Sequence, residues 1–170
     1  PPGAWGARVC RGAPAGCRFR GEDGGVRAGL KAIGGRGSFH SEDGYRLRER
    51  MHLRVEGDPS SHPVWRDSTA ALRCTQRLVK LAHETGKRVH VLHVTTREEA
   101  MFLAEHKDVA SCEATPSRLT LAAPEDSERT GPLAQPNPAV RDASHPRALS
   151  PPFPRALAAT TAPPPTPPTP

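Results

Sequence analysis

The feature that most constrains the fold is a short apolar run that directly follows an amphipathic helix. Residues 88–94, RVHVLHV, are almost continuously apolar, which is typical of a strand buried on both faces of a parallel sheet. Residues 67–86 before it carry apolar side chains at helical spacing. Asp67 or Ser68 is placed to cap the first turn, and Gly86 is placed to end the last one. A helix that leads into a buried strand favours an α/β fold.

Further helices and strands are predicted on both sides of this pair. Along the chain we expect a helix, a strand, two helices, a strand, a helix and a strand, joined by short links. The expected elements cover residues 22–33, 35–40, 41–54, 67–86, 88–94, 95–106 and 107–116, with a loop at 58–64. Ser41 or Asp43 can cap the second helix, and Thr96 and Glu99 have capping-box spacing. This alternation is typical of parallel sheets with helical crossovers, including (β/α)8 barrels.

The distribution of proline confines the folded part to the middle of the chain. Of the 20 prolines, 13 fall within residues 132–170, and the final TTAPPPTPPTP favours polyproline II and cannot bury a core. Residues 1–21 are rich in Gly, Pro, Ala and Arg and show neither helical nor strand periodicity. We therefore expect the folded part of the chain to lie roughly between residues 22 and 141. Residues 1–21 and 150–170 are expected to be disordered, or to be translated out of the native reading frame.

Charge and cysteine content argue against several other classes of protein. The net charge is +6, but basic residues alternate with acidic ones, as in YRLRERMHLRVEGD, and no nucleic-acid-binding motif is present. The four cysteines form no CxxC pair, which suits a reduced, cytoplasmic protein better than a disulfide scaffold. No run of about 18 apolar residues is present. We therefore expect neither nucleic acid nor a membrane as a partner.

Two histidines are the candidate metal ligands. His40 and His93 end two predicted strands, and the carboxyl ends of parallel strands carry the working residues of (β/α)8 barrels. Imidazole is a common zinc ligand, and a catalytic zinc takes ligands from several strands. The alternative is that each histidine only donates a hydrogen bond to a neighbouring carbonyl. His90 alternates to the other side of its strand and is expected to pack. The histidines in helix or loop contexts are expected to have no role in the site: His52, His62, His83, His106 and His145.

Four segments of the chain resemble a known enzyme family. They are FHSEDGYRLRERM, GDPSSHPVWRDSTAALRCTQRLVKLAHETGKRVHVLHVTT, EATPSRLTLAAPED and AQPNPAVRD, in that order. Together they resemble consecutive segments of a dihydroorotase, a zinc-dependent cyclic amidohydrolase of the amidohydrolase superfamily. The similarity extends from Glu22 to Leu149 without gaps. Its motifs are a strand ending in HSED, a strand ending in HVTT, and the later patterns TP..L and NP.VRD.

This resemblance implies a concrete function. Dihydroorotases are (β/α)8 barrels that interconvert N-carbamoyl-L-aspartate and L-dihydroorotate, the ring-closing step of pyrimidine biosynthesis, by means of a metal-activated water. The resemblance therefore implies that residues 22–149 form a partial (β/α)8 TIM-like barrel. By the same resemblance, His40 and His93 are metal ligands, zinc is the cofactor, and Asn137 contacts the substrate in the mouth of the barrel. The implied partners are the small-molecule substrate and, as a candidate protein partner, aspartate transcarbamoylase.

The sequence also departs from the family pattern. The N-terminal HxH pair of the family, the arginine that grips the substrate carboxylate, and the DHAPH-like segment with the catalytic aspartate are not recognised in the chain. The family's TPHHL is TPSRL here, so that Ser117 and Arg118 stand where the family has two histidines. No catalytic residue is therefore assigned. We expect the chain to be an internal piece of a dihydroorotase, bounded by truncation or frame errors and inactive by itself.

Three alternatives stay open at this point. Another cyclic amidohydrolase, such as a dihydropyrimidinase or allantoinase, would share the HVTT motif, and the segment that would separate these enzymes is not recognised here. A non-catalytic dihydroorotase-like subunit could scaffold aspartate transcarbamoylase without the missing motifs. A basic nucleic-acid binder has only the net charge in its favour.

Overall fold

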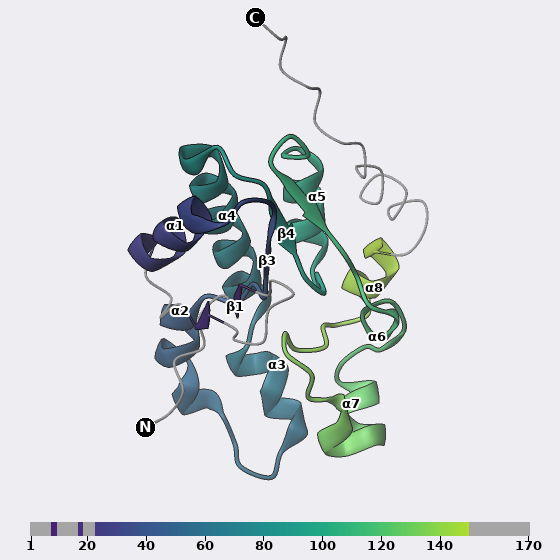
Figure 1. Cartoon of the computed structure of the whole chain (residues 1–170). Coiled ribbons are helices and arrows are strands. Elements are labelled where there is room, and N and C mark those ends of the chain that lie inside the picture. Colours follow the sequence, from purple (N-terminus) through teal and green to yellow (C-terminus); the bar gives the residue numbers. More distant parts are fainter. Residues whose placement is uncertain (1–7, 10–16, 19–22, 150–170) are drawn as a thin grey trace, which may run out of the picture.

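The computed structural model describes residues 8–9, 17–18 and 23–149 (Figure 1). The strands are β1 (Arg8–Val9), β2 (Cys17–Arg18), β3 (Gly37–Phe39), β4 (Val89–Val91) and β5 (Ala110–Cys112). The helices are α1 (Asp23–Ala32), α2 (Gly44–Glu49), α3 (His62–Trp65), α4 (Ser68–Thr85), α5 (Arg97–Ala104), α6 (Pro116–Thr120), α7 (Glu125–Thr130) and α8 (Ser144–Leu149). Short 3-10 turns are η1 (Met51–Leu53), η2 (Pro59–Ser61) and η3 (Gly131–Ala134). The predicted tail, residues 150–170, lies outside the described residues.

The strands form one sheet in the order β2-β1-β3-β4-β5. Strands β3, β4 and β5 are parallel, with Phe39 aligned to Val91 and Val91 aligned to Cys112. The parallel α/β architecture predicted from the sequence is therefore present as three parallel strands joined by helical crossovers. Strands β1 and β2 add an antiparallel extension within residues 1–21, where no strand was expected. Each has only two residues, which is too short to leave a periodic pattern in the sequence.

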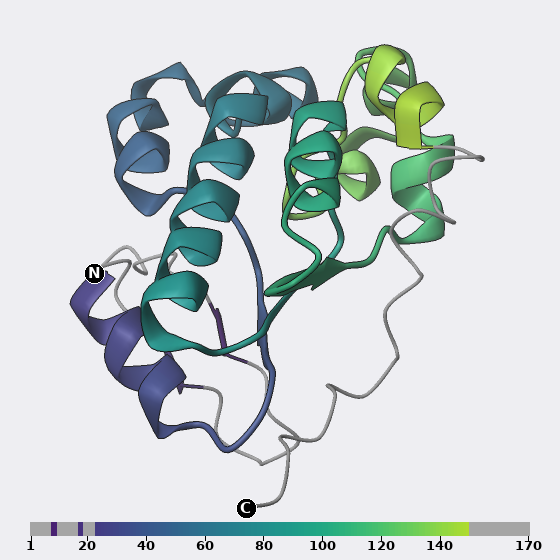
Figure 2. The same ribbon diagram turned by 90° about the horizontal axis from the view of Figure 1, so that it is seen from above.

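Helices α1, α4 and α5 lie on one side of β3 and β4 (Figure 2). The side chains that face this helical layer are apolar and fully buried, and they include Phe39 of β3 and Val91 of β4. The intervening positions Ser38, His90 and Ser111, which are aligned across the three strands, are polar and only partly buried. The sheet therefore has one apolar and one polar face. Strand β4 is not apolar on both faces, as its sequence suggested, because His90 occupies the second face.

The predicted start and end signals of the long helix are confirmed. The carboxylate of Asp67 accepts a hydrogen bond from the N–H of Ala70 at 2.9 Å, which caps α4. Gly86 follows the helix with a φ of 62°, the left-handed conformation that glycine adopts without steric cost. Thr96 and Glu99 form the predicted capping contact of α5, with the N–H of Glu99 donating to Oγ1 of Thr96 at 3.1 Å.

The segment between β3 and α4 differs from the prediction. One helix was expected over residues 41–54, but α2 ends at Glu49 and the turn η1 follows. Residues 58–64, expected as a loop, contain η2 and the start of α3. Asp58 caps η2, and two prolines occupy first-turn positions, where the N–H that proline lacks would have no partner within the helix. Local capping thus converts a proline-containing loop into two short helical turns.

Two further expectations concern thiols and membranes. Cys74 is buried and Cys112 is partly buried, and both are free thiols. Burial raises the pKa of Cys74 to about 11, so that this thiol stays protonated near neutral pH. In the described part of the chain, no helix combines the length and the apolar character needed to cross a bilayer.

Candidate metal and anion site

The carboxyl ends of the three parallel strands bring distant residues together. His40 follows β3 directly, His93 lies two residues beyond β4, and Arg118 lies on α6, the helix that follows β5. His40 and His93 thus occupy the strand ends at which the sequence placed them. Among the described residues, His93 is the only non-glycine with a positive φ, which is 41°. This conformation is costly for a side chain with a Cβ and is found preferentially at functional positions.

The rings of His40 and His93 meet in an edge-to-face arrangement. Nδ1 of His40 lies 3.3 Å from Nε2 of His93, and the ring centroids are 4.9 Å apart. Two nitrogen ligands of a tetrahedral zinc ion, each about 2.0–2.1 Å from the metal, lie about 3.4 Å from each other. The two nitrogens therefore have the spacing of neighbouring ligands on one zinc ion, as well as the spacing of a hydrogen bond.

Glu42 holds the other side of the His40 ring. Nε2 of His40 lies 2.8 Å from Oε2 of Glu42, and the same carboxylate accepts hydrogen bonds from Nε and Nη2 of Arg66. Burial alone would raise the pKa of Glu42, but hydrogen bonds from His40 and Arg66 and the charge of Arg66 lower it to about 2. The carboxylate is therefore ionised at neutral pH. It orients His40 in the way that a carboxylate behind a metal-bound histidine does.

The residues present fit a zinc site in part. Burial, followed by the positive charges of His40 and Arg118, lowers the pKa of His93 to about 4. The ring is thus neutral near pH 7, which is the form that binds a metal. Within the described residues, however, no group of three or more His, Cys, Asp or Glu side chains is arranged to hold a metal ion. Two ligand positions and one orienting carboxylate are therefore assigned, and the set is incomplete.

Three buried arginines, here called the arginine cluster, lie near this pair: Arg66, Arg118 and Arg141 are 2%, 6% and 5% exposed. Arg66 is paired with Glu42. Arg141 donates from Nη1 to the carbonyl oxygen of Arg66 and from Nε to Oγ1 of Thr95 at 3.2 Å. The arginine cluster therefore concentrates positive charge beside the histidine pair. The carboxylate of Glu42 compensates part of this charge, but it is shared between Arg66 and His40.

Asn137, predicted to contact the substrate, lies in a different hollow. It lines a cavity of about 570 Å³ between the η1–α3 segment and the η3 turn, together with His62, Trp65 and Arg66. The residues lining this cavity include neither His40 nor His93. Arg66 is the link between the two places, because it lines the cavity and also pairs with Glu42. Asn137 therefore lies in a separate cavity, which is connected to the histidine pair by the chain of contacts from Arg66 to Glu42 to His40.

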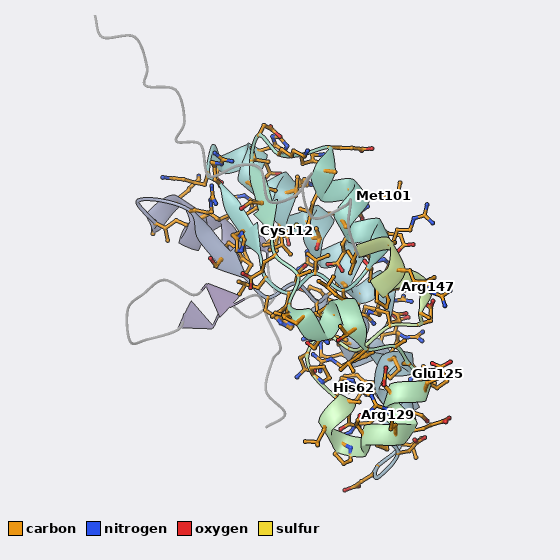
Figure 3. All side chains as sticks on the ribbon, turned by 90° about the vertical axis from the view of Figure 1, so that its right-hand side faces the viewer. His62, Met101, Cys112, Glu125, Arg129 and Arg147 are labelled. Carbon is orange, nitrogen blue, oxygen red and sulfur yellow. The ribbon has the colours of Figure 1, made fainter. Side chains whose placement is uncertain are left out.

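The remaining histidines stay outside the pair. His90 places Nδ1 2.9 Å from Oγ of Ser111, on the polar face of the sheet. His145 is buried and accepts a hydrogen bond from the N–H of Arg97 at 3.1 Å. His62 differs from its expected passive role in that it lines the cavity beside Asn137, near α7 in Figure 3.

Acidification should destabilise the fold through His62. Burial, followed by the charge of Arg66, lowers the pKa of His62 from 6.5 to about 4. Because the unfolded chain binds this proton more readily, the stabilisation is complete above pH 6.5 and is lost as the pH falls toward 4. The difference in pKa corresponds to at most about 3 kcal/mol. Urea unfolding at pH 7 and pH 5 should show that the free energy of unfolding falls less for His62→Gln than for the wild type when the pH is lowered. The exposed His52→Gln should behave like the wild type, and equal losses in all three proteins would contradict this role.

The described residues form a partial parallel α/β sheet with helical crossovers, the class of structure to which (β/α)8 barrels belong. No protein-family model matches the chain, and no curated protein matches its sequence. Solved structures do match its fold. An L-hydantoinase (dihydropyrimidinase) from Arthrobacter aurescens superposes with a TM-score of 0.69 and 23% identity, over 75% of this chain and 30% of that chain. A dihydropyrimidinase from Brevibacillus agri NCHU1002 superposes with a TM-score of 0.66 and 21% identity, over 75% of this chain and 30% of that chain.

A third structure extends the same comparison. A D-hydantoinase from Bacillus sp. AR9 superposes with a TM-score of 0.67 and 22% identity, over 77% of this chain and 31% of that chain. The chain therefore spans about 30% of the length of the solved structures that it matches. These proteins are hydantoinases and dihydropyrimidinases, whereas the sequence motifs resemble dihydroorotases. The comparison shows the fold alone, which matches part of each of these hydantoinase and dihydropyrimidinase structures.

Sequence reasoning identified His40 and His93 but missed Glu42, Arg66 and Arg118. Glu42 has a sequence signal, because it follows His40 by two residues in HSED. Arg66 has no local signal, since 24 positions separate it from its partner Glu42. Arg118 was recognised only as a departure from the family pattern. The convergence of the strand ends is what places these charged side chains at one site.

Proposed function

We propose that this chain supplies part of the metal centre of a cyclic amidohydrolase of the dihydroorotase type. The observation that carries the proposal is the pair of nitrogens, Nδ1 of His40 and Nε2 of His93, 3.3 Å apart at the ends of adjacent parallel strands. The ionised carboxylate of Glu42 behind His40 supports a ligand role. The order of the HSED, HVTT, TP..L and NP.VRD motifs supports the dihydroorotase type.

The chemistry follows from these residues. A bound zinc ion would lower the pKa of a water molecule and polarise the amide carbonyl of the cyclic substrate. His40 and His93 would hold the ion, and Glu42 would fix the ring orientation of His40. Asn137 would contact the substrate by the resemblance to the family. Proton transfer to the ring nitrogen is assigned to no residue of the described part.

A second candidate within the same reaction class is the hydrolysis of hydantoins or dihydropyrimidines. Three solved structures with a similar fold carry those names, and their TM-scores lie between 0.66 and 0.69. The two candidates share the metal centre and the ring-opening reaction. They differ in the substrate, because dihydroorotate carries a carboxylate that hydantoin and dihydrouracil lack.

The proposed function is tested on the coding DNA on both sides of this segment. Translation of all three frames should reveal an HxH motif upstream and a DHAPH-like motif downstream, which would complete the ligand set and supply the aspartate. The protein expressed from that extended frame, loaded with zinc, should hydrolyse L-dihydroorotate faster than dihydrouracil or hydantoin. The 170-residue chain assayed in parallel should be inactive. Faster hydrolysis of the neutral substrates would favour the second candidate, and the absence of both motifs from every frame would reject the proposal.

A further inference from the structure

Arg118 is a buried guanidinium without a partner. The residue is 6% exposed, and its Nε and Nη1 are fully buried with no hydrogen-bond partner among the described residues. No salt bridge or side-chain hydrogen bond of Arg118 occurs in the described part of the chain. A buried N–H without an acceptor costs about 1–3 kcal/mol, and more when the group is charged. Such an arrangement points to an acceptor that the folded chain itself does not provide.

The surrounding charges leave this guanidinium uncompensated. Burial, followed by the charge of Arg141, lowers the pKa of Arg118 to about 10, so that it stays protonated at neutral pH. Arg141 also has an unpartnered buried nitrogen, Nη2. Glu42, the carboxylate whose charge acts on Arg118, is already bound by Arg66 and His40. Two arginines at this place therefore have hydrogen-bond capacity for an anion, and the neighbouring carboxylate is in use.

The position of Arg118 relates it to the histidine pair. Arg118 lies on α6, the helix that follows β5, whereas His40 and His93 lie just beyond the ends of β3 and β4; the three strands are neighbours in the sheet. The charge of Arg118 acts on the pKa of His93, which places the two side chains within electrostatic reach. An anion bound by Arg118 would therefore lie next to the proposed metal ligands.

We propose that Arg118, assisted by Arg141, binds the carboxylate of an anionic cyclic substrate beside His93. A guanidinium presents parallel N–H donors that match a carboxylate, and such charge-assisted pairs are the strongest hydrogen bonds available to side chains. The inference rests on the proposed function for its choice of substrate. It makes Arg118 a specificity residue that selects a carboxylate-bearing ring over a neutral one. Nε and Nη1 of Arg118 are buried in the structure, so binding requires that they become accessible to the ligand.

The test compares two rings that differ only in the carboxylate. Isothermal titration calorimetry measures the binding of L-dihydroorotate and of dihydrouracil to the full 170-residue chain. The buffer has low salt and contains a metal chelator. We expect the wild type to bind L-dihydroorotate at least about tenfold more tightly, which is the size of one charge-assisted contact. Arg118→Met, which keeps an unbranched apolar stem but removes the guanidinium, should abolish the preference, and Arg118→Lys should retain part of it. A full preference in Arg118→Met, or no preference in the wild type, would overturn the inference.

Two controls keep the outcome interpretable. Arg129, on α7 in Figure 3, is an exposed arginine paired with Asp126, so Arg129→Met should leave the preference unchanged. If Arg118→Met fails to fold, modification of wild-type arginines by phenylglyoxal replaces it, with peptide mass spectrometry as the readout. L-dihydroorotate should then slow modification at Arg118 and not at Arg129, whereas dihydrouracil should slow neither. Equal modification of Arg118 with and without L-dihydroorotate would contradict the inference.

The measurement is independent of the metal. Because the titration is made in a chelator, a chain that binds no zinc can still show the carboxylate preference. Anion binding without zinc binding would reject the proposed metal centre and retain the Arg118 site. Zinc binding that depends on His40 and His93, without a carboxylate preference, would do the reverse.

Discussion

Glu42→Gln should lower the free energy of unfolding by about 3–5 kcal/mol, the largest change in stability expected for a single substitution in this site. The carboxylate of Glu42 is the acceptor of two hydrogen bonds from Arg66, and both side chains are almost completely buried. Glutamine keeps the shape of the side chain but removes the charge, which leaves the Arg66 guanidinium buried without its counter-ion. Urea unfolding followed by circular dichroism, in a chelator at pH 7, measures the change.

A matched control is available on the surface. Glu84 forms an ion pair with Arg27, but both side chains are more than a third exposed to solvent. The exposed fraction is 35% for Glu84 and 38% for Arg27. Exposed ion pairs contribute about 0–1 kcal/mol, so Glu84→Gln should change stability little. If the two variants lost similar amounts of stability, the buried Glu42–Arg66 pair would not have the structural role assigned to it.

The second large effect concerns zinc. His93→Ala and His40→Ala should each weaken zinc binding to the 170-residue chain by at least about tenfold, since even a residue that only orients a ligand contributes about 10–100-fold. Each substitution removes one of the two nitrogens that lie 3.3 Å apart. Competition with a chromophoric chelator measures the affinity, and the visible spectrum of the Co²⁺ form reports the ligand geometry. Because the ligand set in the described part is incomplete, the wild-type affinity itself should be weak.

The control for zinc binding is an exposed histidine. Nδ1 of His52 lies 2.9 Å from the carbonyl oxygen of Glu49, and the other ring nitrogen is available to a metal in solution. His52→Ala should therefore leave the affinity unchanged if zinc binds between His40 and His93. Equal losses in all three variants would mean that the ion binds histidines non-specifically on the surface, and the proposed ligand pair would be wrong.

Several parts of the fold were predictable because their causes are local. Helix α4 has its apolar face, its Asp67 cap and its terminal Gly86 within one stretch of sequence, and all three predictions are confirmed. The residues near 58–64 were less predictable, because prolines favour loops and also begin helices. The two-residue strands β1 and β2 could not be predicted, since β1 forms by pairing with β3 and β2 by pairing with β1, and no local pattern marks either strand.

The candidate site was predictable only where a motif marks it. HSED and HVTT place His40 and His93 at strand ends, and the structure has them there. The same motifs do not separate a dihydroorotase from a hydantoinase, and the solved structures with a similar fold do not separate them either. Substrate choice depends on side chains at the mouth of the site, and those come from several strands and helices.

By itself, the sequence determined the alternation of helices and strands, the parallel α/β class and the two histidines, because hydrophobic periodicity and capping act within a few residues of each other. Only the tertiary structure decided that His40 lies beside His93 across 53 positions, that Glu42 pairs with Arg66 across 24, and that Arg118 has no hydrogen-bond partner among the described residues. These contacts depend on the order and register of β3, β4 and β5. Register is a property of strands that are far apart in the sequence, so no single segment carries it.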